Sequence, residues 1–447
     1  MREALAHCDA WLPHGLELGA AAVLGKGECP LPVRARAGRW EAFDFSTLDA
    51  RQLILAAAPA DGAEGRAILE RAAEARMKVL LIEGGKLRPL RIEDLIGCPL
   101  GDIDEARIRG IIAGKRVLIT GAGGSIGSEL ARRVSELAPA RLTLLDSSEY
   151  NLFRISQELP DAALALADIR DQQAMRRWFK RERPQIVFHA AALKQVPLVE
   201  MFPSEGVLTN VAGVRNVAEA AYGVGADLVF VSTDKAVDPS GVMGASKRLG
   251  EMYCQALDRK GGLRAVPLRL GNVLGSTGSV IPTFEAQLAA GGPLTVTDPD
   301  VTRFFLSIPQ AADALLQAAA VGLGAPVRGA ALAIDMGEAL PVVELAREVI
   351  RLEGLRPDVD VPIVFTGLRP GEKLHEALIG ADEWRDDDPA ANVIAVGSPA
   401  RGLAELHEIM ERLVLLAREG ADSVVTRELF DALAGDIAVE RERALAG

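Results

Sequence analysis

The sequence predicts an α/β protein whose main domain is a doubly wound parallel sheet. Short apolar segments alternate with segments of helical periodicity from residue 115 to about residue 275. This alternation is typical of parallel strands joined by crossover helices. The first apolar segment runs directly into a glycine-rich turn, after which a helical pattern begins at Ser125. A smaller C-terminal subdomain and a small N-terminal α/β domain complete the expected architecture.

Residues 1–110 are expected to form the small α/β domain and a connector. Two apolar runs, residues 52–58 and 79–82, flank a helical pattern over residues 63–76. That is the order of a βαβ unit. Neither run is followed by a glycine fingerprint. A structural or docking role is therefore favoured over the binding of a regulatory ligand.

Residues 111–447 are expected to form the main domain, with a core at about 115–275 and a smaller subdomain with C-terminal helices at about 276–447. The predicted core strands are residues 117–120, 141–145, 164–167, 185–189, 228–232 and 265–270. After the last of these the pattern loosens, and a capping subdomain is predicted from short segments at residues 303–305, 332–336 and 361–365. Residues 403–446 are helical and charged, which suits packing or an oligomer surface.

Three glycines, Gly121, Gly124 and Gly127, follow the first predicted strand in the spacing G-x-x-G-x-x-G. A strand, a tight glycine turn and a helix form the context in which glycines indicate dinucleotide binding rather than a plain turn. Glycines let backbone N–H groups approach a pyrophosphate, and the helix N-terminus adds donors and a positive dipole end. Ser125 and Ile126 lie in the same turn and are expected to contact the cofactor as well.

An acidic residue, Asp146, ends the second predicted strand. It lies near the distance from the first glycine, roughly 20 residues, at which a carboxylate binds the adenosine ribose hydroxyls. A carboxylate there repels a 2′-phosphate, so NAD is expected rather than NADP. Further cofactor contacts are expected at this strand end and the next two, from Ser147, Asp168, Ile169, Ala190 and Ala191.

The composition excludes several classes of protein. Acidic residues outnumber basic ones by 62 to 50, a formal charge of −12, which argues against binding to nucleic acid or an anionic membrane. The four cysteines form no C-x-x-C pair and the five histidines have no metal-ligand spacing. We therefore expect no metal site and a reducing, cytoplasmic location. No apolar run reaches the roughly 18 residues that span a bilayer, and no signal peptide is evident.

The fifth predicted strand runs into the segment Thr233-Asp234-Lys235. Neighbouring side chains on an extended strand point to opposite faces. This carboxylate and this amine can therefore share one substrate only if the backbone turns there. Met243 and Lys247 come next, and their spacing of four places both side chains on one helix face.

These segments resemble the CapD-like polysaccharide-biosynthesis group of UDP-N-acetylglucosamine 4,6-dehydratases, which are extended short-chain dehydrogenases with a Rossmann fold. The resemblance covers about residues 85–380. Its motifs are residues 120–130 (TGAGGSIGSEL), 190–197 (AAALKQVP), 232–237 (STDKAV), 269–273 (RLGNV) and 367–373 (GLRPGEK). Short members carry Tyr where this chain has Met243, and long members carry Met, so the chain resembles the long type. Long members usually bear N-terminal membrane helices, and a longer form with such helices would lie at the inner face of the membrane.

The resemblance implies an NAD-dependent enzyme that converts UDP-N-acetylglucosamine into a UDP-4-keto-6-deoxy-N-acetylhexosamine for a bacterial surface polysaccharide. By resemblance, Asp234 is the acid that protonates the C6 oxygen and Lys235 is the base at C5. Thr233 helps to deprotonate the C4 hydroxyl, and Lys247 binds the nicotinamide ribose. Met243 takes the usual tyrosine position, although a thioether cannot accept a proton. A homo-oligomer, at least a dimer, is also implied.

Substrate contacts are expected from polar residues at strand ends and in the capping subdomain: Lys194, Asn272, Thr297, Arg303, Arg369 and Glu372. Guanidinium groups suit phosphate, and a carboxylate suits ribose hydroxyls. Two other functions stay open. A UDP-sugar 4-epimerase needs no acid for a leaving hydroxyl, but normally uses the tyrosine. A catalytically silent NAD-binding sensor or scaffold would tolerate the loss of that base.

Overall fold

The structure is a computed structural model that forms two compact units. The residues that it describes are 44–47, 51–55, 58–59, 61–83, 86–96, 103–325, 328–385 and 392–445, with side chains to residue 434, and the strands β1 (Ala21–Leu24) and β2 (Val33–Ala37). Unit 1 comprises Met1–Cys98, Val280–Thr302 and Leu340–Gly367. Unit 2 comprises Pro99–Ser279, Arg303–Ala339 and Leu368–Gly447.

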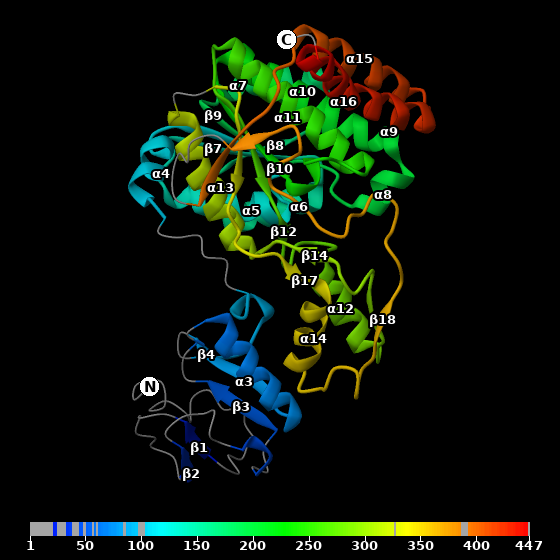
Figure 1. The fold of residues 1–447 in the computed structure, drawn as a ribbon. Coiled ribbons are helices and arrows are strands. Elements are labelled where there is room, and N and C mark those ends of the chain that lie inside the picture. Colours follow the sequence, from blue (N-terminus) through cyan, green and yellow to red (C-terminus); the bar gives the residue numbers. More distant parts are fainter. Residues whose placement is uncertain are drawn as a thin grey trace. The chain divides into compact units, whose positions relative to one another are not determined.

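Unit 2 is built on a nine-stranded sheet of order β19-β20-β16-β11-β10-β9-β6-β7-β8 (Figure 1). Its parallel strands are β6 (Arg116–Thr120), β7 (Arg141–Asp146), β8 (Ala163–Leu166), β9 (Ile186–His189), β10 (Asp227–Thr233), β11 (Ala265–Leu270) and β16 (Ala331–Ile334). Beyond β16, β20 (Val393–Gly397) pairs antiparallel with β16, and the edge strand β19 (Trp384–Arg385) pairs antiparallel with β20. The predicted doubly wound parallel sheet, a Rossmann-like fold, is therefore confirmed.

Helices cover both faces of this sheet (Figure 1). Those of unit 2 used below are α4 (Glu105–Ile112), α5 (Ser125–Glu136), α7 (Gln172–Glu182), α10 (Gly213–Val224), α11 (Val242–Lys260), α13 (Ile308–Gly324), α15 (Leu403–Arg418) and α16 (Asp422–Leu445). Strands buried on both faces are near-continuous apolar runs, and in β6 the side chains from Val117 to Ile119 are at most 1% exposed. All six predicted strands appear within a residue or two of their expected bounds, although β8 at the sheet edge has only Ala165 buried. The C-terminal segment forms α15 and α16, and α15 contributes Leu406, Met410 and Leu413 to the core.

The predicted placement of residues 332–336 in the capping subdomain is wrong. These residues form most of β16, which lies beside β11 in the main sheet with Leu332 opposite Leu268. All four residues of β16 are buried, as a strand inside a covered parallel sheet requires. The chain leaves the sheet after β11 and returns to it only after α13. The long crossover made the returning strand look like part of a separate subdomain.

Unit 1 contains the predicted N-terminal βαβ unit. Strands β3 (Gln52–Leu55) and β4 (Lys78–Glu83) are parallel and are joined by α3 (Gly62–Glu74), and β5 (Lys86–Pro89) adds an antiparallel strand. Residues 56–57 of the predicted first strand lie outside the described residues. The βαβ order is confirmed.

The segments from the second half of the chain also belong to unit 1. They supply α12 (Val280–Ala289), α14 (Val342–Leu352) and the parallel pair β13 (Leu294–Val296) and β18 (Ile363–Phe365). Helix α14 packs against α3, and Arg351 lies 3.4 Å from Glu70 across this contact. The N-terminal α/β segment thus shares a compact unit with segments that the sequence assigns to the capping subdomain. Over the described ranges, no helix combines the length and apolarity needed to cross a membrane.

Candidate active site

The glycine turn after β6 is as tight as its spacing predicts. Gly121 has φ +65°, and a Cβ there would lie 2.7 Å from the Ala191 backbone. A Cβ on Gly127 would lie 2.0 Å from the Gly121 carbonyl oxygen. Within the described ranges no side chain caps the N-terminus of α5, whose first residues are Ser125 and Ile126. The first N–H groups of that helix are therefore oriented to bind an anion.

Asp146 lies at the end of β7 and holds the glycine turn in place. Its Oδ2 accepts a hydrogen bond from Gly123 N at 2.9 Å, and its Oδ1 accepts one from Ser148 N at 2.9 Å. The carboxylate is buried, while the following Ser147 is exposed. The predicted ribose-binding carboxylate thus also fixes the loop that would approach the pyrophosphate.

The two predicted contacts after β8 differ in placement. Asp168 is exposed, and its Oδ1 accepts a hydrogen bond from Arg170 N at 2.8 Å. Ile169 is 5% exposed and packs in the hydrophobic core. Its side chain would collide with any Cβ on Gly213, since the nearest atom would lie 2.5 Å away. The Ile169 side chain is therefore part of the hydrophobic core, and only its backbone is left to contact a cofactor.

The end of β9 is fixed from both sides. His189 Nδ1 and Thr120 Oγ1 lie 2.7 Å apart, and burial lowers the pKa of this histidine to about 3, so the ring is neutral. The small residues Ala190 and Ala191 follow. Asn210, in the π-helical turn η4 (Val207–Ala212), bonds both backbone groups of Leu193 at 2.9 Å.

Lys194 lies in the segment that Asn210 holds. Its Nζ donates to Ser276 Oγ at 3.0 Å, and partial desolvation of the amine lowers its pKa although the residue as a whole is exposed. A cation that is partly desolvated at a strand end suits an anionic or hydroxylated ligand. The placement agrees with the expected substrate contact, which stays a prediction.

Three predicted residues converge directly after β10. The strand ends at Thr233, and a single turn of 3-10 helix, η5 (Asp234–Ala236), replaces the extended backbone. Thr233 Oγ1 and Lys235 Nζ each donate to Asp234 Oδ1 at 2.9 Å. Asp234 is fully buried, and its Oδ2 has no hydrogen-bond partner among the described residues. The backbone therefore turns where it must for Asp234 and Lys235 to share one substrate.

The Lys235 amine is surrounded by oxygen atoms. Besides Asp234, it donates to Asn272 Oδ1 at 2.8 Å, and Asn272 belongs to the short strand β12 (Asn272–Val273). Glu376 Oε1 lies 3.8 Å from the same nitrogen. The Lys235 side chain keeps 21% exposure, so it borders both the interior and solvent.

Lys247 lies beneath this turn on α11. Its Nζ donates to Val231 O at 2.8 Å and lies 4.5 Å from the centre of the Phe230 ring. Burial lowers its pKa to about 8, although Glu251 opposes that shift. Met243, one helical turn earlier, is 3% exposed and belongs to the hydrophobic core.

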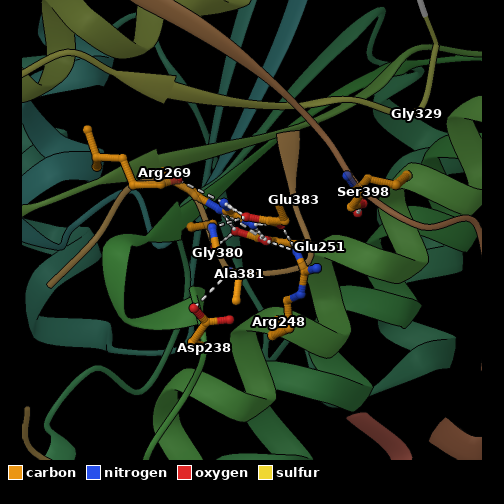
Figure 2. Close-up of polar contacts among 12 residues, drawn as sticks. Asp238, Arg248, Glu251, Arg269, Gly329, Gly380, Ala381, Glu383 and Ser398 are labelled. Carbon is orange, nitrogen blue, oxygen red and sulfur yellow. Dashed lines mark hydrogen bonds and ion pairs between the residues drawn. The ribbon is translucent and has the colours of Figure 1, made fainter. Parts of the chain in front are cut away.

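Four charged side chains, Arg269, Glu251, Glu383 and Arg248, form a cluster in which each is at most 14% exposed (Figure 2). Arg269 pairs with Glu251 at 2.6 Å and with Glu383 at 2.6 Å. Burial alone would lower the pKa of Arg269, but the two carboxylates raise it above its usual value. Glu251 also accepts a hydrogen bond at 2.6 Å from Ser232, the residue before Thr233. The cluster therefore locks the end of β10.

The remaining predicted substrate residues are placed less directly. Arg303 is 8% exposed and donates to the Leu374 and Lys373 carbonyl oxygens at 2.9 and 2.8 Å. Arg369 and Glu372 form an ion pair of 2.7 Å. Thr297 follows β13 in unit 1. Their contacts with a substrate stay predictions.

Two features of the site were missed in the sequence. Glu376 lies in an irregular segment, with no strand end to draw attention to it. Arg269 did carry a signal, because a charged residue inside an apolar strand requires buried counter-charges. No three His, Cys, Asp or Glu side chains in the described part of the chain could hold a metal ion.

Comparison with known proteins identifies relatives of this chain. Residues 117–397 match the family described as "Polysaccharide biosynthesis protein". The chain is 43% identical over 307 residues to "Probable polysaccharide biosynthesis protein EpsC" of Bacillus subtilis, covering 67% of this chain and 50% of that protein. It is 42% identical over 311 residues to "Capsular polysaccharide biosynthesis protein CapD" of Staphylococcus aureus, covering 68% and 51%. The chain thus spans about half the length of these two relatives.

An epimerase is also among the relatives. The UDP-glucose 4-epimerase of Rickettsia canadensis is 33% identical over 299 residues, which cover 65% of this chain and 84% of that protein.

Two solved structures share the fold. Pen from Bacillus thuringiensis has a TM-score of 0.58 and 28% identity, covering 65% of this chain and 89% of that one. DesIV, a dTDP-glucose 4,6-dehydratase from Streptomyces venezuelae crystallised as a double mutant with NAD and DAU bound, has a TM-score of 0.52 and 26% identity, covering 59% and 88%.

Proposed function

The chain belongs to the polysaccharide biosynthesis protein family of extended short-chain dehydrogenases, and we propose that it is an NAD-dependent 4,6-dehydratase of UDP-N-acetylglucosamine. The product would be a UDP-4-keto-6-deoxy-N-acetylhexosamine for a bacterial surface polysaccharide. The observation that carries the proposal is the convergence of a hydroxyl and an amine on one buried carboxylate oxygen, Asp234 Oδ1. A dehydratase needs such an acid and base together, because it removes a proton and a hydroxyl group from one sugar.

The residues present fit NAD. A Cβ on Gly121 or Gly127 would fill the turn where the pyrophosphate is expected, and Asp146 suits the adenosine ribose. Lys247 would hold the nicotinamide ribose. The bound NAD in DesIV supports this choice of cofactor. Bound NAD⁺ would supply a hydride acceptor for sugar C4 and, once reduced, a hydride donor for C6, which would make the overall reaction redox-neutral.

The chain's own residues would move the protons. Thr233 relays the C4 hydroxyl proton to Asp234 Oδ1 along their 2.9 Å hydrogen bond. An ordinary aspartate is ionised at neutral pH, and this transfer turns Asp234 into the acid that an elimination requires. Asp234 then gives the proton to the C6 oxygen, which leaves as water. Lys235, as a neutral amine, takes the C5 proton and later returns it to C5.

This route explains how the reaction proceeds with Met243 in the tyrosine position. The C4 hydroxyl proton and the C6 hydroxyl group together make the water that leaves, so no further base for the C4 proton is needed.

The test is to incubate the chain with NAD⁺ and UDP-N-acetylglucosamine and to measure the masses of the products by mass spectrometry. We expect a species lighter than the substrate by one water molecule. Its absence, with the cofactor retained, would overturn the proposal and favour a binding protein without turnover.

The second candidate is a UDP-sugar 4-epimerase, which the similarity to the Rickettsia canadensis enzyme favours. An epimerase would give a product of unchanged mass whose C4 configuration is inverted. Met243 argues against this candidate, because an epimerase of this superfamily normally uses the tyrosine that is missing. Proton NMR of the product sugar distinguishes the two reactions.

A further inference from the structure

Glu376 is a buried carboxylate that faces the Lys235 amine. Its side chain is 2% exposed, with Oε1 3.8 Å from Lys235 Nζ and Oε2 3.6 Å from Lys373 Nζ. Asp234 and Arg303 are the other charged groups that act on it. Oε2 makes no hydrogen bond within the described residues. A carboxylate this deeply buried and incompletely bonded requires an explanation.

The segment that carries Glu376 is held firmly. Arg303 donates to the carbonyl oxygens of Lys373 and Leu374, and Lys373 Nζ donates to Val237 O at 2.6 Å. Further along, Arg269 donates to Leu378 O at 3.0 Å. These bonds fix the backbone on both sides of Glu376, so the fold holds its carboxylate next to Lys235.

The proposed dehydration leaves one proton unassigned. Lys235 has to be a neutral amine before it takes the C5 proton, but an ordinary lysine is protonated at neutral pH. Asp234 cannot receive the surplus proton, because it takes the one from the C4 hydroxyl. A second carboxylate within reach of the amine is needed, and Glu376 is the remaining one beside it.

We infer that Glu376 is a positioning residue that holds the surplus proton of Lys235 while the amine acts as base. This inference rests on the proposed function. The Lys235 N–H bond breaks and a Glu376 O–H bond forms, which converts an ion pair into two neutral groups. When the C5 proton has been returned, Glu376 gives its proton back to Lys235.

The environment of Glu376 suits this exchange. Burial raises its pKa, Lys235 and Lys373 lower it, and Asp234 raises it. A group whose ionised form is disfavoured by burial accepts a proton readily. The 3.8 Å separation is about 1 Å longer than a hydrogen bond, a gap that a rotation of the flexible lysine side chain closes.

The test compares Glu376→Gln with the parent across pH. Glutamine keeps the size of the side chain but cannot take the proton, so Lys235 has to lose it to solvent. We expect kcat at neutral pH to fall by roughly 10- to 100-fold, with KM within about threefold. The variant's rate should then rise steadily toward alkaline pH, where the parent's rate is level. Glu376→Asp, which keeps a carboxyl group, should retain the parent's level profile at a lower kcat.

Glu182→Gln is the matched control. Glu182 is also buried in unit 2 and ion-paired, with Arg141 at 2.6 Å, but it lies at the opposite end of the sheet from the site. This variant should keep the parent's pH profile. A Glu376→Gln profile with the same shape as the parent's would overturn the inference, while a parent that releases no dehydrated product would overturn the proposed function instead.

A second measurement does not depend on turnover. Subtracting the infrared spectrum of Glu376→Gln from that of the parent isolates the carboxyl band of Glu376. The pH dependence of this band should give a pKa above the usual glutamate range. In Lys235→Met the loss of the cation should raise that pKa further. A band that does not respond to Lys235→Met would show that the two groups do not exchange a proton.

Discussion

Lys235 Nζ lies 2.9 Å from Asp234 Oδ1 although the two residues are neighbours in the chain. On an extended strand their side chains would point to opposite faces of the sheet. The contact exists because β10 ends at Thr233, whose hydroxyl accepts a hydrogen bond from Lys235 N at 3.4 Å and caps the turn that follows. The Thr233 hydroxyl thus both caps the turn that ends the strand and contacts Asp234, the carboxylate to which it is proposed to pass a proton.

Asp234→Asn should abolish most of the dehydration. The amide has the shape of the carboxylate but cannot carry a proton from Thr233 to the C6 oxygen. We expect kcat to fall by roughly 10²- to 10⁴-fold, while NAD⁺ binding, measured by calorimetry, stays within about threefold of the parent. Dehydrated product formed at the parent's rate would remove Asp234 from the proposed mechanism.

Gly127→Ala should damage both the fold and the nucleotide site. The added Cβ would lie 2.0 Å from the Gly121 carbonyl oxygen, so the turn has to open. We expect the free energy of unfolding to fall by about 1–3 kcal/mol and NAD⁺ binding to be lost. Gly110→Ala in α4 is the control, because nothing lies within 4 Å of its Cβ. It should stabilise the helix by roughly 0.5–1 kcal/mol, and equal effects of the two variants on denaturant unfolding would contradict the argument.

Lys247→Met should separate stability from cofactor binding. Burial lowers the pKa of Lys247 to about 8 from the ordinary lysine value of 10.5. The folded chain therefore binds fewer protons than the unfolded chain between these two pH values. Stability should therefore rise from about pH 8 to 10.5 in the parent, and this rise should vanish in the variant. At pH 7 the variant should melt at the parent's temperature or higher, because an apolar side chain replaces a desolvated cation. Its affinity for NAD⁺, measured by equilibrium dialysis, should be at least about tenfold weaker; unchanged affinity would argue against a ribose contact.

Glu348→Gln should change the pH dependence of unit 1. Glu348 on α14 is 5% exposed, and burial raises its pKa to about 7, although Arg351 opposes the shift. The folded chain keeps a proton between pH 4.5 and 7 that the unfolded chain has lost, so the parent should become less stable as pH rises through this window. The glutamine stays neutral throughout. Thermal unfolding at pH 5 and pH 8 should show the parent losing about 1–3 kcal/mol relative to the variant, and parallel behaviour of the two would show that Glu348 titrates normally.

The strands and the turn were predictable because their causes are local. Buried parallel strands require apolar runs, and Gly121 and Gly127 are the residues that a tight turn against neighbouring backbone requires. Residues 332–336 were misplaced because the sheet resumes after a long crossover, and partners that distant leave no local pattern. Glu376 was missed for the same reason, since only the folded chain brings it to Lys235.

The charge cluster around Arg269 limits where this chain can be joined to segments of a relative. One of the two carboxylates paired with Arg269 belongs to Glu383, which lies far along the chain from β11. A chimaera could keep β11 of this chain but take the segment that contains Glu383 from a relative. The guanidinium of Arg269 would then face a segment that did not evolve with it. Chimaeras made within this family should therefore take residues 378–383 and β11 from the same parent.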